Sequence, residues 1–500
     1  MGITIFVSLY TTRIVLNALG IEDFGIFNLI GGAIAMLTFL NASMASASQR
    51  FMSYAQGQQD KDRQRRIFNA SIIMHAIIAI TLLLVLEGIG ILLFKGVIKI
   101  APERMQAAWI VYQLSIISTI FIILSVPYEA VINARENMLL IAILGIAESF
   151  LKLGVAHYLL YTENDKLIVY VLFTAIVTIS MVGLKVAYCH QKYNECIWAP
   201  KKYADRRLFK EMATFASWSF MGTSSSMVSN YGQGIVLNTF FGTKVNAAQG
   251  IASQISGQLG AFASTMLRAL NPLIAKSEGA GDRQLMLRAS MIGSKMGFLL
   301  ILITTAPVLL EMPYIFDVWL KIVPEYTVIF CQLLLVRNLI EQLFIPLASS
   351  IAAVGKIRNY QISTSILTLL PLPAAFILFK LSFEPYALYA TFVIYSIITS
   401  IVILYYAYIV CNIPVKFYLK NVIVRCLAAL TITLSIGSIP LFLMPADFSR
   451  LIIVTITTTI AFFFSAWHIG FDQIEKKALS VVAKDVSKTL LVLRKKIFNI

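Results

Sequence analysis

Residues 386–411 read YALYATFVIYSIITSIVILYYAYIVC and contain no charged side chain. A helix crosses the ~30 Å hydrocarbon core of a bilayer in about 20 residues, so this stretch predicts a transmembrane helix. The whole chain of 500 residues has the same character, with 58% hydrophobic residues, 13% charged residues and a mean hydropathy of +0.80. This composition leaves no room for a sizeable soluble catalytic domain and predicts an all-α integral membrane protein.

Further apolar segments flank this one, separated by Gly, Pro, Asn and charged residues. Together they predict about fourteen transmembrane helices, at residues 1–19, 24–54, 67–94, 106–131, 139–160, 167–188, 213–241, 246–274, 288–310, 326–354, 359–379, 386–411, 421–443 and 450–470. Only about a dozen residues precede Arg13 in the first segment, which is short for a full crossing. We therefore expect the recorded start to omit part of helix 1.

The net charge of +16 is distributed unevenly among the loops. Every second loop, beginning with 57–67, together with the tail from 472, holds 26 Lys and Arg in total. The intervening loops, of which 311–325 is the longest, hold eight. The positive-inside rule then places the first set and both termini in the cytoplasm, and the excess charge does not indicate nucleic-acid binding. From Leu479 the tail is amphipathic and basic, which predicts a helix lying on the membrane surface, with a coiled coil as the alternative.

An internal repeat divides the chain. Ile14-Val15-Leu16-Asn17 recurs as residues 235–238, each time followed by a break that contains glycine. The Gly-x-x-Asp pattern of residues 57–60 recurs at residues 279–282 (Gly-Ala-Gly-Asp), each time before a basic stretch. Such repeats are typical of transporters. We expect a six-helix bundle at 1–188, a basic linker at 189–212, a second six-helix bundle at 213–411, two further helices within 412–471 and the tail at 472–500.

Four segments carry a family resemblance: SLYTTRIVLNALGIEDFGIFNLIGG (8–32), NASMASASQRFMSYAQG (41–57), PYEAVINARENM (127–138) and AAVGKIRNYQ (352–361). They resemble the polysaccharide and O-antigen repeat-unit flippases of the multidrug/oligosaccharidyl-lipid/polysaccharide (MOP) exporter superfamily, in particular the polysaccharide biosynthesis proteins of Bacteroidetes-type bacteria. The resemblance covers the chain, and it is strong in the first 70 residues and weaker after 380. It implies two bundles around a central cleft and transport of an undecaprenyl-pyrophosphate-linked oligosaccharide.

Three arginines are candidates for binding such a substrate. Arg13, Arg50 and Arg268 lie in apolar segments at comparable regions of the two repeats, without a nearby acidic residue in the sequence. A buried charge needs a partner or a hydrated cavity, and a guanidinium offers bidentate donors to a pyrophosphate. Snorkelling toward the headgroups is the alternative.

Six further charged residues are candidates for gating or ion coupling. Glu148 and Lys152, like Arg337 and Glu341, are four residues apart, so each pair shares a helical face and is expected to form a structural ion pair. Glu87 and Glu129 have no local partner. Either could be protonated in the membrane, and Glu129 could instead pair with Arg13 or Arg50.

No sequence motif indicates enzymatic chemistry. The chain has no P-loop, HExxH or GxSxG motif, and we expect neither a metal nor another cofactor. The sequence thus predicts a flippase of the bacterial inner membrane for O-antigen or capsule assembly, with membrane lipids and the polymerase and chain-length machinery as partners. A multidrug or cation exporter of the same superfamily is the first alternative, and a membrane polysaccharide polymerase or glycosyltransferase is the second.

Overall fold

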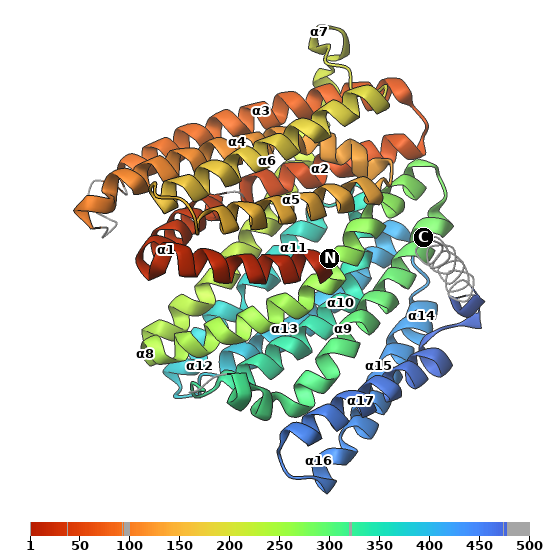
Figure 1. Ribbon diagram of the computed structural model, residues 1–500. Helices are drawn as coiled ribbons and strands as arrows, with labels where there is room; N and C mark the ends of the chain where they lie inside the picture. Colours follow the sequence, from red (N-terminus) through yellow and green to blue (C-terminus); the bar gives the residue numbers. More distant parts are fainter. Residues whose placement is uncertain are drawn as a thin grey trace, which may run out of the picture. The chain divides into compact units, whose positions relative to one another are not determined.

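The computed structural model describes residues 2–37, 39–92, 94, 101–319, 323–473 and 475–477. Every regular element within these ranges is helical (Figure 1). The helices are α1 (Gly2–Leu37), α2 (Phe39–Gly57), α3 (Lys61–Leu92), α4 (Met105–Ala134), α5 (Met138–Tyr158), α6 (Lys166–Lys192), α7 (Pro200–Tyr203), α8 (Arg206–Gly279), α9 (Arg283–Trp319), α10 (Thr327–Val354), α11 (Arg358–Leu369), α12 (Pro371–Lys380), α13 (Ala387–Cys411), α14 (Val415–Tyr418), α15 (Val424–Gly437), α16 (Ile439–Leu443) and α17 (Phe448–Ser465). A 3₁₀ turn (Pro102–Arg104) precedes α4, and π-helical turns follow α14 (Leu419–Ile423) and α17 (Ala466–Gly470).

These helices correspond to the predicted spans. Among the described residues, ten helical segments are long and apolar enough to cross a membrane. The other four predicted spans correspond to parts of α1, α2 and α8, because α1 bends at Gly20 and α8 bends at Gly242 into a first and a second arm. The second arm of α1 together with α2 matches the predicted span at 24–54. The prediction of an all-α, multi-pass membrane protein is therefore confirmed. The predicted loop at 311–325 is wrong in its first half, because Pro307 and Pro313 bend α9 around Glu311 without ending it, and the helix continues to Trp319.

Two glycines produce the sharp bends in the long helices. Gly20 in α1 has φ +80°, and Gly242 in α8 has φ +76°. This left-handed region is strained for residues with a Cβ, so a glycine is favoured at both positions. Both bends follow the repeated Ile-Val-Leu-Asn tetrapeptide, as the sequence repeat predicted.

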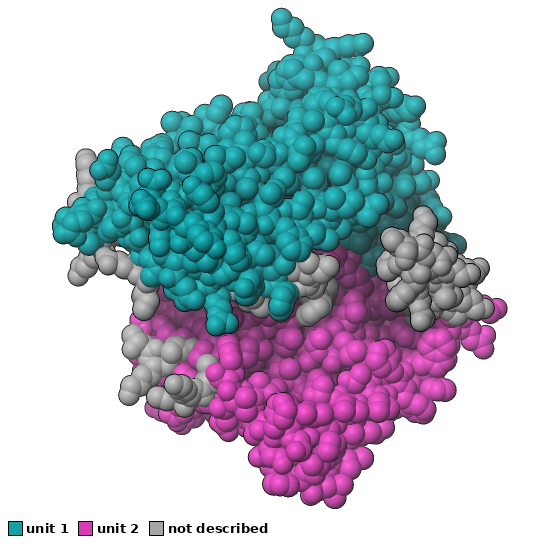
Figure 2. Space-filling model, viewed as in Figure 1, with its two compact units in different colours: residues 1–227, 269–286, 350–365 teal, residues 228–268, 287–349, 366–500 magenta. Residues whose placement is uncertain are grey.

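The chain packs as two compact units, coloured separately in Figure 2. Unit 1 contains residues 1–227, 269–286 and 350–365, and unit 2 contains residues 228–268, 287–349 and 366–500. Unit 1 includes segments of the predicted second bundle, at 213–227, 269–286 and 350–365, whereas each predicted bundle is one continuous stretch of the chain. The end of α8 with the start of α9, and the end of α10 with the start of α11, both belong to unit 1.

In unit 1, α3, α4 and α6 run side by side, with α2 and α5 packed against them (Figure 1). An apolar core forms between α3, α4, α6 and the second half of α1, and it includes Ile30 of α1, Leu86 of α3, Val111 of α4 and Leu167 of α6. The opposite sides present large apolar residues outward, such as Leu139 and Phe150 of α5. An apolar exterior of this kind is stable in lipid and would be unstable in water.

Unit 2 has its own core around Leu237, Phe316, Phe330 and Leu388. In the same unit α15 packs along α17, at the lower right of Figure 1. The amphipathic helix predicted from Leu479 lies outside the described residues.

Candidate functional site

The repeated Gly-x-x-Asp segments form the same turn twice, at an offset of 222 residues. The Oδ1 atom of Asp60 accepts the backbone N–H of Arg63 at 2.8 Å, and that of Asp282 accepts the N–H of Leu285 at 2.9 Å. The residue directly before each aspartate has a positive φ, 56° in the first turn and 79° in the second. Each aspartate therefore begins the next helix, α3 or α9, as an N-cap.

The helix ends that precede these turns cross at two glycines. A Cβ built on Gly57 would lie 1.9 Å from the carbonyl oxygen of Lys276, and one built on Gly279 would lie 2.0 Å from that of Tyr54. The offset of 222 residues also relates Tyr54 to Lys276, so the two contacts are equivalent. Only glycine permits this approach, and the crossing joins the first repeat to the second. We call it the glycine crossing.

A polar cavity of about 620 Å³ adjoins the glycine crossing. Across it, the Nζ atom of Lys276 lies 2.7 Å from a carboxylate oxygen of Glu136, and each of these side chains is almost two-fifths exposed. An ion pair with this exposure contributes little stability and breaks easily. The other polar residues lining the cavity include Gln56, Gln59, Lys61, Gln64, Arg135 and Asp282. All of these belong to loops predicted to be cytoplasmic, or to the adjoining helix ends.

Arg50, predicted to bind substrate, is engaged with the protein. Its Nη2 atom donates to the carbonyl of Ala353 at 2.8 Å, and its Nε atom donates to the carbonyls of Ala352 and Ala353 at 3.1 and 3.2 Å. These carbonyls end α10, where the helix dipole favours a cation. Gly355 follows with φ +92°, and a Cβ there would lie 2.5 Å from Nη2. The guanidinium also lies over the rings of Phe51, Tyr54 and Phe215.

Arg50 therefore links α2 of the first repeat to α10 of the second. The signal for this contact was present in the sequence, since Ala-Ala-Val-Gly at 352–355 has the glycine expected just beyond a helix C-terminus. What the sequence could not give was the partner, because 302 residues separate Arg50 from Ala352.

Arg13 and Arg268 are both exposed, and neither has an ion-pair partner among the described residues. Arg13 belongs to unit 1, as Arg50 does, and Arg268 belongs to unit 2. At the offset of the glycine crossing, the counterpart of Arg50 is Pro272. Arg268 therefore lies about one helical turn from the position equivalent to Arg50.

Both predicted helical ion pairs are present. Lys152 Nζ lies 2.6 Å from Glu148, and Arg337 Nε lies 2.6 Å from Glu341. Their suggested part in gating stays a prediction.

The two isolated glutamates also have partners within unit 1. Glu87 accepts a hydrogen bond from Gln113 at 3.2 Å. Glu129 of α4 pairs with Lys185 of α6, and not with Arg13 or Arg50, which the sequence had offered as alternative partners. The two helices are adjacent, whereas Arg50 is held at the end of α10. The signal for the pair was Lys185 itself, a lone cation in an apolar helix.

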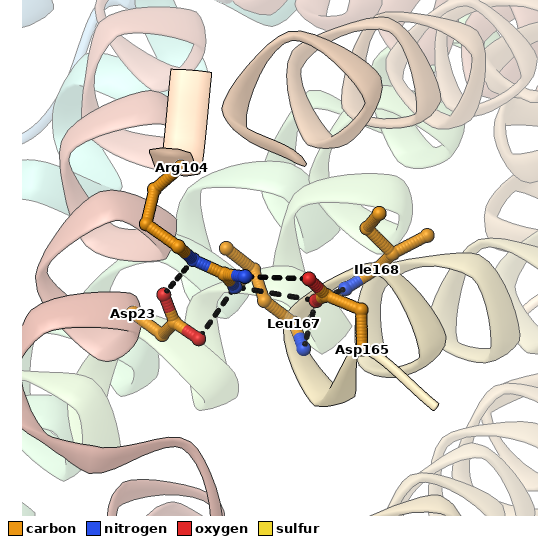
Figure 3. A network of polar contacts seen from close by, with 5 residues as sticks. All are labelled: Asp23, Arg104, Asp165, Leu167 and Ile168. Carbon is orange, nitrogen blue, oxygen red and sulfur yellow. Dashed lines mark hydrogen bonds and ion pairs between the residues drawn. The ribbon is translucent and has the colours of Figure 1, made fainter. Parts of the chain in front are cut away.

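One ion network was missed by the sequence analysis. Arg104 donates to both carboxylate oxygens of Asp23, at 2.8 and 2.6 Å, and also pairs with Asp165 (Figure 3). Asp165 in turn accepts the backbone N–H groups of Leu167 and Ile168 and begins α6. Burial opposes ionisation of Asp165, but the hydrogen bonds from Arg104 and from the two backbone N–H groups outweigh it and lower the pKa of the carboxyl group. The network ties the second arm of α1 to the starts of α4 and α6.

Two other ion pairs join distant segments within single units. In unit 1, Arg135 makes two hydrogen bonds of 2.8 Å to Glu195, which raise the pKa of the guanidinium. In unit 2, Arg450 holds the buried Glu311 at 2.8 and 2.9 Å, at the bend in α9. Sequence separations of 60 and 139 residues hid both pairs from any local rule.

No protein-family model matches the sequence, and no curated protein matches it. Solved structures do match. A crystal structure of a MATE mutant has a TM-score of 0.72 and 14% identity, covering 82% of this chain and 93% of that one. An outward-facing multidrug resistance MATE family transporter of the MOP superfamily has a TM-score of 0.69 and 13% identity over the same shares.

A third similar structure is a MOP superfamily transporter from Pyrococcus furiosus. It is described as having a binding pocket of reverse polarity that suggests a different function, and it matches with a TM-score of 0.67 at 14% identity over 82% of this chain and 93% of that one. At such identities the likeness concerns the fold. The chain therefore has the same fold as these transporters.

Proposed function

We propose that this chain is an inner-membrane flippase that moves polyprenyl-pyrophosphate-linked oligosaccharide repeat units across the membrane by alternating access. The transporter fold supports the general activity, and the four quoted segments, which resemble O-antigen and capsule repeat-unit flippases, support the cargo. No covalent bond changes in this process, and both termini are cytoplasmic in the proposed orientation.

The glycine crossing is the observation that carries the proposal. Two duplicated helix ends approach as closely as backbones allow, at the side where the basic loops are placed by the positive-inside rule. Arg50 and the Lys276–Glu136 pair add further contacts between the repeats there. These contacts close the cytoplasmic side in one state of the cycle and separate when cargo enters. Glycines leave no interlocking side chains to obstruct the separation.

The charges favour an anionic cargo. Arg13 and Arg268 are exposed and without ion-pair partners among the described residues, so their guanidinium groups are available to a pyrophosphate. For the Pyrococcus furiosus transporter, a pocket of reverse polarity is described as suggesting a different function, which supports the use of binding-site charge to infer the cargo in this fold.

A multidrug or cation exporter is the second candidate, because one of the similar structures is a multidrug resistance transporter. Such an exporter needs a carboxylate available to a cation. In this chain Glu129, Glu148 and Glu341 are each paired with a cation, and Glu87 accepts from Gln113. This arrangement favours the flippase.

The test is complementation of a strain that lacks this protein. Surface polysaccharide and the sidedness of the lipid-linked intermediate are scored for the wild type, for Arg13→Ala/Arg268→Ala, and for Arg207→Ala as a matched control outside the apolar segments. We expect the double variant to leave the intermediate in the inner leaflet and the control to behave as wild type. Full transport by a well-expressed double variant would refute the cationic mechanism. Restored resistance to cationic drugs without polysaccharide would favour the exporter.

A further inference from the structure

An apolar groove of about 360 Å³ lies between α2, α3 and the first arm of α8, all within unit 1. Its walls are Met44 from α2, three apolar residues of α3 and a stripe of α8. The residues lining it on α3 and α8 are Met74, Ile77, Ile78, Phe209, Ala213, Ala216, Ser217 and Phe220. Methionine side chains adapt to flexible occupants, and Ile77 is about half exposed at the edge.

The polar atoms of the groove are already bonded within the protein. Ser217 donates to the carbonyl of Ala213 at 2.8 Å, and Ser43 donates to Thr223 at 3.3 Å. An occupant therefore meets an apolar wall, which suits a hydrocarbon chain better than water or a sugar.

The length of the groove along α8 is about the thickness of one membrane leaflet. Phe209 lies three residues inside the start of α8, and Phe220 lies eleven residues further. At 1.5 Å per residue this is about 16 Å along the helix, roughly half of the ~30 Å hydrocarbon core. The positive-inside rule places the start of α8 at the cytoplasmic surface, so the groove opens toward the inner leaflet.

Two cationic side chains lie at the start of α8, which is the cytoplasmic end of the groove in the predicted orientation. Arg206 and Lys210 are exposed and have no ion-pair partner among the described residues, whereas the nearby Arg66 is paired with Asp205 at 3.3 Å. Cations at the headgroup level beside an apolar channel complement an amphiphile with a negative headgroup.

We propose that this groove binds an anionic phospholipid of the cytoplasmic leaflet, with one acyl chain between α3 and α8 and the headgroup at Arg206 and Lys210. The proposal concerns a lipid that stays with the protein and is independent of the cargo. The lipid bridges α3 and α8 where their side chains leave space.

The experiment uses the purified full-length protein in detergent, given dioleoylphosphatidylglycerol and dioleoylphosphatidylcholine in equal amounts, with retained lipid counted by native mass spectrometry. We expect Arg206→Gln/Lys210→Gln to lower the preference for phosphatidylglycerol about thirtyfold, equivalent to about 1 kcal/mol for each cation. The matched control is Lys416→Gln/Lys420→Gln, an exposed pair with the same spacing on unit 2, which should keep the preference.

Filling the groove with a large side chain tests whether the acyl chain of the lipid binds there. Ala216→Trp should abolish lipid retention, and Ser217→Trp, at an exposed position, serves if the first variant fails to fold. Ala142→Trp on the exposed side of α5 is the control and should retain lipid. Unchanged lipid retention in a folded groove variant would overturn the proposal. An equal loss of the phosphatidylglycerol preference in Arg206→Gln/Lys210→Gln and in Lys416→Gln/Lys420→Gln would also overturn it. So would displacement of phosphatidylglycerol by equimolar polyprenyl phosphate, which would make the polyprenyl carrier the preferred occupant.

Discussion

Placing a methyl group in the glycine crossing tests whether the two repeats must touch there. A Cβ at Gly57 would lie 1.9 Å from the carbonyl oxygen of Lys276, and ordinary contact begins near 3.4 Å. The helix ends must then separate by roughly 1.5 Å. Overpacking of this kind costs about 1–3 kcal/mol, so Gly57→Ala should lower the population of the closed contact about 5- to 150-fold. Gly279→Ala should act alike, because it is the equivalent position.

A control separates this effect from helix propensity, because alanine is favoured over glycine in a helix by up to about 1 kcal/mol. Gly154→Ala in α5 is suitable, since nothing lies within 4 Å of the added Cβ. It should be neutral or stabilising, whereas both crossing variants should reduce transport in the complementation assay.

The contact itself is followed by cross-linking. Cysteines in place of Glu136 and Lys276 replace the ion pair beside the crossing, and the five native cysteines are buried. A short bismaleimide should join the pair in an otherwise wild-type background and with Gly154→Ala, and much less with Gly57→Ala. Wild-type cross-linking and wild-type transport in Gly57→Ala would refute the reasoning.

Three further predictions concern single interactions. Lys295→Met should destabilise the protein by about 3–5 kcal/mol, because it leaves Glu475, bonded at 2.8 and 2.9 Å and 7% exposed, without its cation; adding Glu475→Gln should recover most of the thermal stability. Arg50→Ala should lower stability by about 1.5–3 kcal/mol as well as transport, whereas a side chain that only contacts substrate would affect transport alone. At Asp205, a hydrogen bond from the backbone N–H of Leu208 lowers the pKa of the carboxyl group. The ionised carboxylate therefore stabilises the protein above the unfolded-state pKa near 4, and this stabilisation is lost as the pH falls through the folded-state pKa. The difference in Tm between wild type and Asp205→Asn should shrink below about pH 4, and a constant difference would contradict this.

The sequence alone determined the membrane-embedded helical fold and its internal repeat. Apolar runs such as 386–411 must become helices in lipid, since no water is available to satisfy their backbone groups. Local spacing was also enough for the pairs Glu148–Lys152 and Arg337–Glu341, because residues four apart share a helical face. The recurring tetrapeptide and Gly-x-x-Asp predicted equivalent bends and turns, and the structure has them at Gly20 and Gly242, and at Asp60 and Asp282.

Only the tertiary structure decided which distant side chains meet. The sequence showed Arg50 as an unpaired intramembrane cation, whereas packing places it against the end of α10, 302 residues away. The same holds for Glu129 with Lys185 and for Arg104 between two aspartates. The physical reason is that periodicity fixes which face of a helix a residue occupies, but the neighbour of that face depends on how complete helices pack. The glycine crossing depends on both, because the sequence supplied two residues without a Cβ and the packing brought their backbones together.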